Sequence, residues 1–244
     1  MLLRRITEHV KEQNWFAVGI DFIIVVIGIL IALQIANWSE QEKEKNEAIE
    51  IRLNLIQEFE QNREVLKARI DLIKNSLNYS YEILAFFGQS MEQLNEANID
   101  KTLLSTLFYG NFNPANSTIS DILQSGRLRL IKDNQLKHYL DQWLQLLEDT
   151  DEDFRNQDVQ ANEYFLPYLN SNIAMRNLEV HGDLIIVSEK SVLLEDYYYK
   201  IFNDFKFENL MISHIGWNTI MLGHYENLDQ LALEIVTHIQ QVDN

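Results

Sequence analysis

Three histidines near the C-terminus are the residues best suited to bind a metal or a haem, because they lie on one apolar seam. His214, His224 and His238 follow a helical spacing. At about 1.5 Å of rise per residue, the first two lie about 15 Å apart and the third about 21 Å further on. Metal–nitrogen bonds are about 2 Å long, so no two of them could share an ion without ligands from other helices, such as His138. We therefore expect no metal site and no cofactor, with each ring partly buried and hydrogen-bonded.

Other signatures of catalysis are absent from the sequence. The chain has no cysteine, which excludes a thiolate nucleophile and a thiolate metal site. It contains no glycine-rich phosphate loop, no Gly-x-Ser-x-Gly elbow and no His-Glu-x-x-His pair. The acidic run at residues 148–153 is typical of a solvated helix face, since it lacks the glycine of a calcium loop. We expect no catalytic residues and no enzymatic activity.

A group of aromatic residues precedes the last helical stretch. Its members are Tyr197, Tyr198, Tyr199, Phe202, Phe205 and Phe207. Large rings bury much apolar area, so packing in the core or at the end of a bundle is the first interpretation. A ligand groove or a contact with a partner is the alternative.

The N-terminal segment is apolar enough to cross a membrane, although it carries one acid. Residues 16–36 contain only Asp21 and Gln34 as strongly polar side chains. At about 1.5 Å per residue the segment spans roughly 30 Å, the thickness of the hydrocarbon core. Trp15 and Trp38 flank it, where amphipathic rings prefer the membrane interface. We predict a transmembrane helix over residues 15–38 rather than a signal peptide, whose apolar region would be shorter and would precede a cleavage site.

Asp21 shares one face of this helix with Gly28, Ala32 and Ala36, all within about 60° of it at about 100° per residue. Small residues let membrane helices approach closely. A carboxylate in lipid is best tolerated against another helix or a water-filled cavity. We predict that this face associates with a second copy of the chain or with a protein partner. The alternative places Asp21 near enough to the interface to be hydrated.

Residues 1–14 are predicted to form an amphipathic juxtamembrane segment. Its apolar residues share one stripe: Leu2, Leu3, Ile6 and Val10. This pattern suits a short helix on the membrane surface, although the segment could also continue the transmembrane helix into water.

The charge distribution bears on orientation and on partners. The net charge is −17, and the excess of acid lies entirely after Trp38. Such a domain would repel nucleic acid. Basic residues are nearly balanced on the two sides of the span, so their number does not decide the orientation. A short N-terminal tail before a downstream domain usually stays in the cytoplasm. We expect a bacterial inner-membrane protein with a cytoplasmic N-terminus and a periplasmic C-terminal domain.

The composition favours an all-α fold, because 2 prolines and 8 glycines are too few for many turns. From Ile49 to Leu94 the residues follow a heptad seam with few polar interruptions, among them Arg52. No proline interrupts this stretch, so the helix could continue directly from the transmembrane helix, with a kink or an end at Gly88. A second seam covers residues 207–242.

Residues 39–244 are therefore predicted to form an acidic helical-bundle domain with long helices in up-down order. A parallel coiled coil between protomers is the alternative, because a seam does not reveal which chain supplies its partner. Between the two seams we expect a helix at 101–109, a brief helix capped by Ser117 and ended by Gly126, and a long helix capped by Asp133. A loop with a short strand at 183–187, or a mobile element, would follow.

Two motifs resemble an uncharacterised family of bacterial single-pass membrane proteins. Residues 26–40 read VIGILIALQIANWSE and carry the pattern Gly-x-x-Ile-Ala-x-Gln-x-x-Asn-Trp, and residues 123–133 read LQSGRLRLIKD. The motifs cover about a tenth of the chain. The resemblance implies a membrane anchor followed by a helical domain, and it implies no activity.

Two functional hypotheses follow. In the first, the chain is a non-enzymatic sensor or scaffold whose bundle contacts a ligand or a partner and transmits the change through a continuous helix into the membrane. In the second, it is an oligomeric membrane effector or pore-forming protein whose spans associate through the face of Asp21, Gly28 and Ala32.

Overall fold

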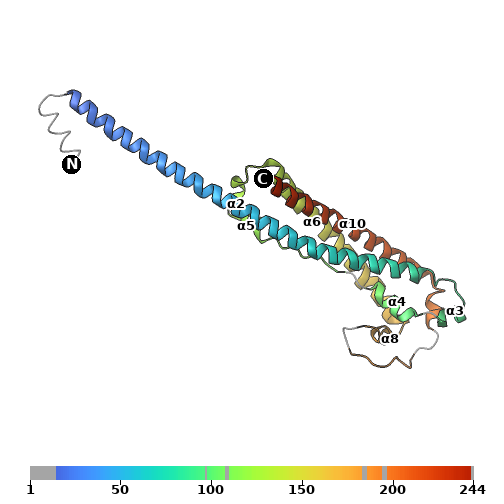
Figure 1. Cartoon of the computed structure of the whole chain (residues 1–244). Helices are drawn as coiled ribbons and strands as arrows, with labels where there is room; N and C mark the ends of the chain where they lie inside the picture. Colours follow the sequence, from blue (N-terminus) through green and yellow to red (C-terminus); the bar gives the residue numbers. More distant parts are fainter. Residues whose placement is uncertain (1–14, 97, 108–109, 183–185, 194–196, 243–244) are drawn as a thin grey trace.

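The computed structural model describes residues 15–242 apart from 97, 108–109, 183–185 and 194–196. Over these residues the fold is all-α and contains no strand, as predicted. Figure 1 shows a very long helix, α2 (Trp15–Leu84), whose second half packs beside α6 (Asn134–Val159) and α10 (Phe205–Val242). The shorter helices are α3 (Met91–Glu96), α4 (Ile99–Thr106), α5 (Ser117–Gln124), the 3-10 helix η1 (Arg127–Leu130), the π-helical segment η2 (Gln160–Phe165), α7 (Leu166–Asn172), α8 (Met175–Glu179) and α9 (Tyr197–Ile201). The amphipathic segment predicted at residues 1–14 lies outside the described residues.

Helix α2 is continuous over 70 residues. Between Gly28 and Gly88 the sequence holds neither glycine nor proline, so nothing interrupts the backbone hydrogen bonds from the apolar segment into the bundle. The helix ends at Leu84, and Gly88 takes a φ of 73° that a side chain would strain. The backbone N–H of Gly88 then donates to the carbonyl of Phe202 at 3.2 Å. The predicted continuity and the predicted end near Gly88 are confirmed.

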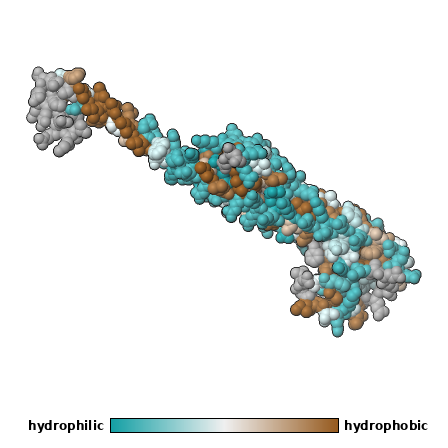
Figure 2. Space-filling model, in the orientation of Figure 1, coloured by the Kyte–Doolittle hydropathy of each residue, from teal (hydrophilic) through white to brown (hydrophobic). Residues whose placement is uncertain are grey.

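The apolar part of α2 extends alone beyond the bundle, as Figure 2 shows by its hydrophobic surface. The most apolar 18-residue stretch of α2 has a mean hydropathy of 2.7, and only 6% of this stretch is buried. This helix is long and apolar enough to cross a membrane. A core helix of the bundle would instead be covered by its neighbours.

The long helices do not alternate in direction as the predicted up-down bundle requires. Paired residues fix the directions: Arg63 with Asp229, Ser76 with Asn218, Gln157 with Asn218, and Asp133 with His238. Helix α10 is therefore antiparallel to both α2 and α6, which run in the same direction. The seam of α2 packs against helices of its own chain, so the bundle needs no second protomer to bury it.

The reason for this topology lies in residues 85–133, which return along α2 as short helices and an extended segment. The side chain of Asn62 holds the backbone of Ala115, donating to its carbonyl at 2.9 Å and accepting from its N–H at 2.7 Å. Glu58, 5% exposed, accepts from the N–H of Thr118 at 2.7 Å and so caps the start of α5. Two polar residues on the core side of α2 thus support a segment that contributes little regular structure.

Three local predictions need correction. Ser117 does not cap α5: it is the first residue of the helix and its hydroxyl donates to Glu58 instead. The helix predicted at 101–109 spans Ile99–Thr106. The region from residue 170 onward is more helical than expected, because α7 continues to Asn172 and α8 follows. Of the possible strand at 183–187, residues 183–185 lie outside the described part and 186–187 have no regular structure.

The first turns of the predicted α2 seam are also wrong. Ile51 and Leu55 are buried, whereas Ile49 is exposed and Arg52 is half-buried. From Phe59 onward the predicted and observed core positions largely agree. The difference arises because the helices separate at this end, so Ile49 and Arg52 face a cavity instead of a packed core.

The core consists of two apolar clusters. The first fills the bundle between α2, α6 and α10, with Phe59, Trp143 and Tyr225 among its buried members. The second lies at the distal end and includes Phe202 and Phe207. Of the predicted aromatic group, Tyr197, Phe202 and Phe207 are buried, as the packing interpretation expects, while Tyr199 and Phe205 are exposed.

Candidate functional site

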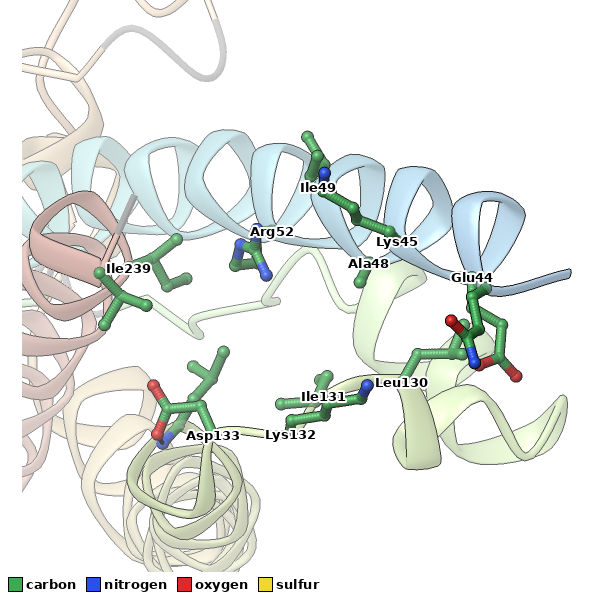
Figure 3. A pocket seen from close by; sticks show the side chains of 13 residues that line it. Glu44, Lys45, Ala48, Ile49, Arg52, Leu130, Ile131, Lys132, Asp133 and Ile239 are labelled. Carbon is green, nitrogen blue, oxygen red and sulfur yellow. Dashed lines mark hydrogen bonds between the residues drawn. The ribbon is translucent and has the colours of Figure 1, made fainter. Parts of the chain in front are cut away.

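A cavity of about 710 Å³ opens where the three long helices separate, at the end of the bundle nearest to the apolar part of α2. Its walls come from α2, from the segment joining η1 to α6, and from the end of α10, and Figure 3 shows these walls facing one another. The lining residues are Gln41, Glu44, Lys45, Ala48, Ile49, Arg52, Leu130, Ile131, Lys132, Asp133, Leu136, Ile239 and Val242. The volume falls in the range of small-molecule sites, which is about 300–1,000 Å³.

Apolar and polar residues both line this cavity, and not all of its charged side chains are paired with an opposite charge. The carboxylate of Glu44 pairs with Arg129, and that of Asp133 pairs with His238. Arg52 also has an interaction partner. No ion pair joins Lys45 or Lys132 to any residue in the part of the chain that the structure describes. The cavity therefore offers two uncompensated cations beside apolar walls.

Asp133 shapes the cavity from the start of α6. Its carboxylate accepts from the N–H groups of Gln135 and Leu136 at 2.8 and 3.0 Å, and lies 2.6 Å from Nε2 of His238. It is therefore the N-cap of α6, as predicted. Partial burial opposes ionisation of this carboxyl, but the hydrogen bonds from Leu136, His238 and Gln135 outweigh it and lower the pKa of Asp133.

Replacing Asp133 with alanine is expected to destabilise the protein by about 1 kcal/mol at pH 7, because two N–H groups at the helix start lose their acceptor. Asp133→Asn retains a capping oxygen and should cost less. Because the folded pKa lies below the ordinary 3.8, the carboxylate contributes stability above that value and loses it as pH falls through the folded pKa. Urea unfolding at pH 7 and pH 3 measures both effects. Equal losses at the two pH values for Asp133→Ala would contradict the charged cap.

The predicted association face is on the far side of α2 from the cavity. Gly28, Ala32 and Ala36 are exposed, and a Cβ added at Gly28 would meet no atom within 4 Å. Asp21 differs from them, since it is 8% exposed and has an interaction partner. Trp15 and Trp38 are both exposed. The structure thus leaves the small residues uncovered but does not leave Asp21 open beside them.

The histidines of the last helix have the separate hydrogen-bonded roles that their spacing predicts. Nε2 of His224 lies 2.8 Å from Asp153, and Nε2 of His214 lies 2.9 Å from the carbonyl of Thr106. Within the described ranges, no three metal-binding side chains come together. Asp153 is the only member of the acidic run at 148–153 that forms such a contact with α10.

A buried polar layer separates the two apolar clusters. It joins the long helices through Ser76, Gln157, His214 and Asn218, together with Thr106 of α4. Nε2 of His214 lies 2.9 Å from the carbonyl oxygen of Thr106 and 2.9 Å from Nδ2 of Asn218, so this ring nitrogen connects α4 with α10. Burial lowers the pKa of His214, against a smaller opposite effect of the Thr106 hydrogen bond. The ring is therefore neutral in the folded state near pH 7.

The free energy of unfolding should decrease as pH drops below the ordinary histidine pKa of 6.5. Below that pH His214 binds a proton in the unfolded chain, whereas in the folded chain it stays neutral because its pKa is lowered. The slope from this group reaches at most about 1.4 kcal/mol per pH unit. We expect His214→Gln to flatten the dependence between pH 7 and pH 5, whereas substitution of the exposed His181 should not. Urea unfolding over this range measures the slope. A His214→Gln variant with the slope of the unsubstituted protein would contradict this account.

Sequence reasoning missed this cavity, although one signal pointed to it. Arg52 interrupts an otherwise apolar seam, and a cation at a core position indicates a place where packing is incomplete. The other walls come from residues 130–136 and 239–242, which approach Arg52 only through the tertiary fold.

Comparison of the chain with protein-family models, with curated protein sequences and with solved structures finds no match. The resemblance of residues 26–40 and 123–133 to a bacterial single-pass family stays a prediction.

Proposed function

We propose that this protein is a non-enzymatic, membrane-anchored sensor or scaffold. Its bundle binds a ligand or a partner, and α2 carries the change to the membrane span. The observation that supports the proposal is the continuity of α2, which provides both the apolar segment and a core helix of the bundle. The proposed cellular location is a bacterial inner membrane, with the residues before the span in the cytoplasm and the bundle in the periplasm.

Continuity matters because a helix transmits displacement only while its hydrogen bonds persist. Between Trp38 and Ile51, where the bundle core begins, about 13 residues cover about 20 Å of helix. A flexible linker of this length would let the bundle move without moving the span. The juxtamembrane cavity lies beside this connecting part of α2, so occupancy of the cavity would act directly on the helix that enters the membrane.

Assembly in the membrane is the second part of the proposal. The uncovered face of Gly28, Ala32 and Ala36 permits close approach of another transmembrane helix. The proposed contact does not involve Asp21, because Asp21 already has a partner within the chain. For the same reason the pore-forming alternative, which needs Asp21 to line a lumen, gains no support.

Purification of the full chain in mild detergent, with measurement of its mass and identification of co-purifying proteins, tests the assembly proposal. We expect a homo-oligomer or a stoichiometric partner, and Gly28→Leu should weaken the association. Gly19→Leu is the matched control, since Gly19 lies about 180° from Gly28 at about 100° per residue. A monomer without partners, in detergent and after cross-linking in membranes, would refute assembly.

A further inference from the structure

We propose that the juxtamembrane cavity binds the headgroup of one anionic phospholipid. The inference rests on the proposed membrane anchorage and names the ligand class of the same site. Gln41, the lining residue nearest to the span, follows Trp38 by three residues, or about 4.5 Å of helix. The cavity therefore opens at the depth of the lipid headgroups, where Trp38 marks the interface.

Charge selects an anion. Lys45 of α2 and Lys132, before α6, both line the cavity, with Lys132 on the wall opposite α2. The two carboxylates of the lining are compensated, Glu44 by Arg129 and Asp133 by His238. Near an anionic lipid surface, each lysine adds favourable binding energy. A chain of net charge −17 thus holds a local pair of available cations at the membrane-facing end of its bundle.

The nearby acids of α2 do not cancel this pair. Glu40 and Glu47 point about 110–130° away from the mean direction of the cavity at about 100° per residue. With Glu44 they surround Arg129, whose pKa is raised mainly by the hydrogen bond to Glu44. Glu42 lies about 90° from the same direction, so Glu44, which is paired with Arg129, is the one acid of this stretch of α2 that lines the cavity.

Apolar residues of the cavity and of an adjoining groove favour an amphiphilic ligand over a small polar anion. The cavity walls include Ala48, Ile131 and Ile239, which suit the upper part of an acyl chain. A second groove lies along the apolar part of α2, over Leu30, Ile31, Gln34, Ile35 and Trp38. At about 100° per residue, the mean directions of groove and cavity differ by only about 40°. One face of α2 therefore offers a path for an acyl chain below a pocket for its headgroup.

Lipid retention through purification provides the test. The full chain is purified in mild detergent, offered phosphatidylglycerol or phosphatidylcholine, and examined by native mass spectrometry. We expect one retained phosphatidylglycerol per chain and little phosphatidylcholine. Lys45→Gln should weaken retention about 5-fold, and Lys45→Gln with Lys132→Gln about 25-fold. Lys43→Gln with Lys67→Gln has the same net charge outside the cavity and should retain the lipid.

Two further experiments distinguish a site for a lipid from a site for free phosphate. Ala48→Trp fills the cavity without changing charge and should abolish retention, with circular dichroism as the check on folding. Inorganic phosphate at constant ionic strength should not displace the lipid, and efficient displacement would indicate a site for free phosphate and overturn the lipid proposal. Equal retention of the two lipids, or equal retention by the two double variants, would also overturn it.

Failure of this inference is separable from failure of the proposed function. Alkaline extraction of membranes reports anchorage alone. A chain removed by alkali would refute the membrane anchor, and with it the lipid site. A chain that stays in the membrane but shows no preference for the anionic lipid would refute only the lipid site.

Discussion

Replacing Trp143 with alanine is expected to lower the free energy of unfolding by about 3–5 kcal/mol. Trp143 of α6 is fully buried against α2 and the returning segment. Its ring meets Phe59 edge-on at a centroid distance of 4.9 Å and lies 6.4 Å from Phe112. Alanine would leave a cavity at the centre of the first apolar cluster and would remove both aromatic contacts.

Denaturant unfolding of the full chain in detergent, followed by circular dichroism, measures this loss. Trp38→Ala is the control, because Trp38 is 68% exposed and lies outside the bundle. We expect its unfolding curve to match that of the unsubstituted protein. A loss below about 1 kcal/mol for Trp143→Ala would mean that the three long helices do not share the core described above.

Asn46→Pro is expected to break α2 between the apolar segment and the bundle. Proline removes one backbone donor and clashes with the carbonyl of Glu42, at a cost of about 3 kcal/mol or more in a helix interior. Asn46 is exposed and does not line the cavity, so its side chain contributes little by itself. Amide protection over residues 42–50 should fall about 100-fold, while protection from Leu55 to Leu84 should stay unchanged.

Hydrogen exchange with mass spectrometry measures this difference in membrane-embedded protein. Asn46→Ala keeps the helix and should leave exchange unchanged. Rapid exchange over residues 42–50 in the unsubstituted protein would show that the connection is already flexible, and the proposed transmission through α2 would then fail.

Local sequence signals predicted much of this architecture. Two apolar seams, scarce glycine and proline, and the cap at Asp133 predicted long helices and one of their starts. Each of these signals depends on residues close together in the chain. Gly88 belongs to the same class, because a glycine after a long periodic stretch ends a helix by its own conformational freedom.

The features that sequence reasoning missed depend on distant residues. Asn62 and Glu58 look like ordinary polar positions of α2, yet they bind the returning backbone at Ala115 and Thr118. Because that return occupies one side of α2, α6 runs parallel to α2 and the bundle is not up-down. The cavity at the end of the bundle follows from the same arrangement, since residues from three separate stretches form its walls.

The distance across the junction of the apolar segment and the bundle tests the central claim, that α2 is one rigid helix through both. The chain has no cysteine, so spin labels at Ile35→Cys and Lys67→Cys would be unique. Both sites are exposed, and their separation of 32 residues corresponds to about 48 Å of continuous helix. Pulsed electron paramagnetic resonance on the full chain in lipid nanodiscs should give one narrow distribution near that value. A broad distribution, or one centred well below about 40 Å, would contradict the claim.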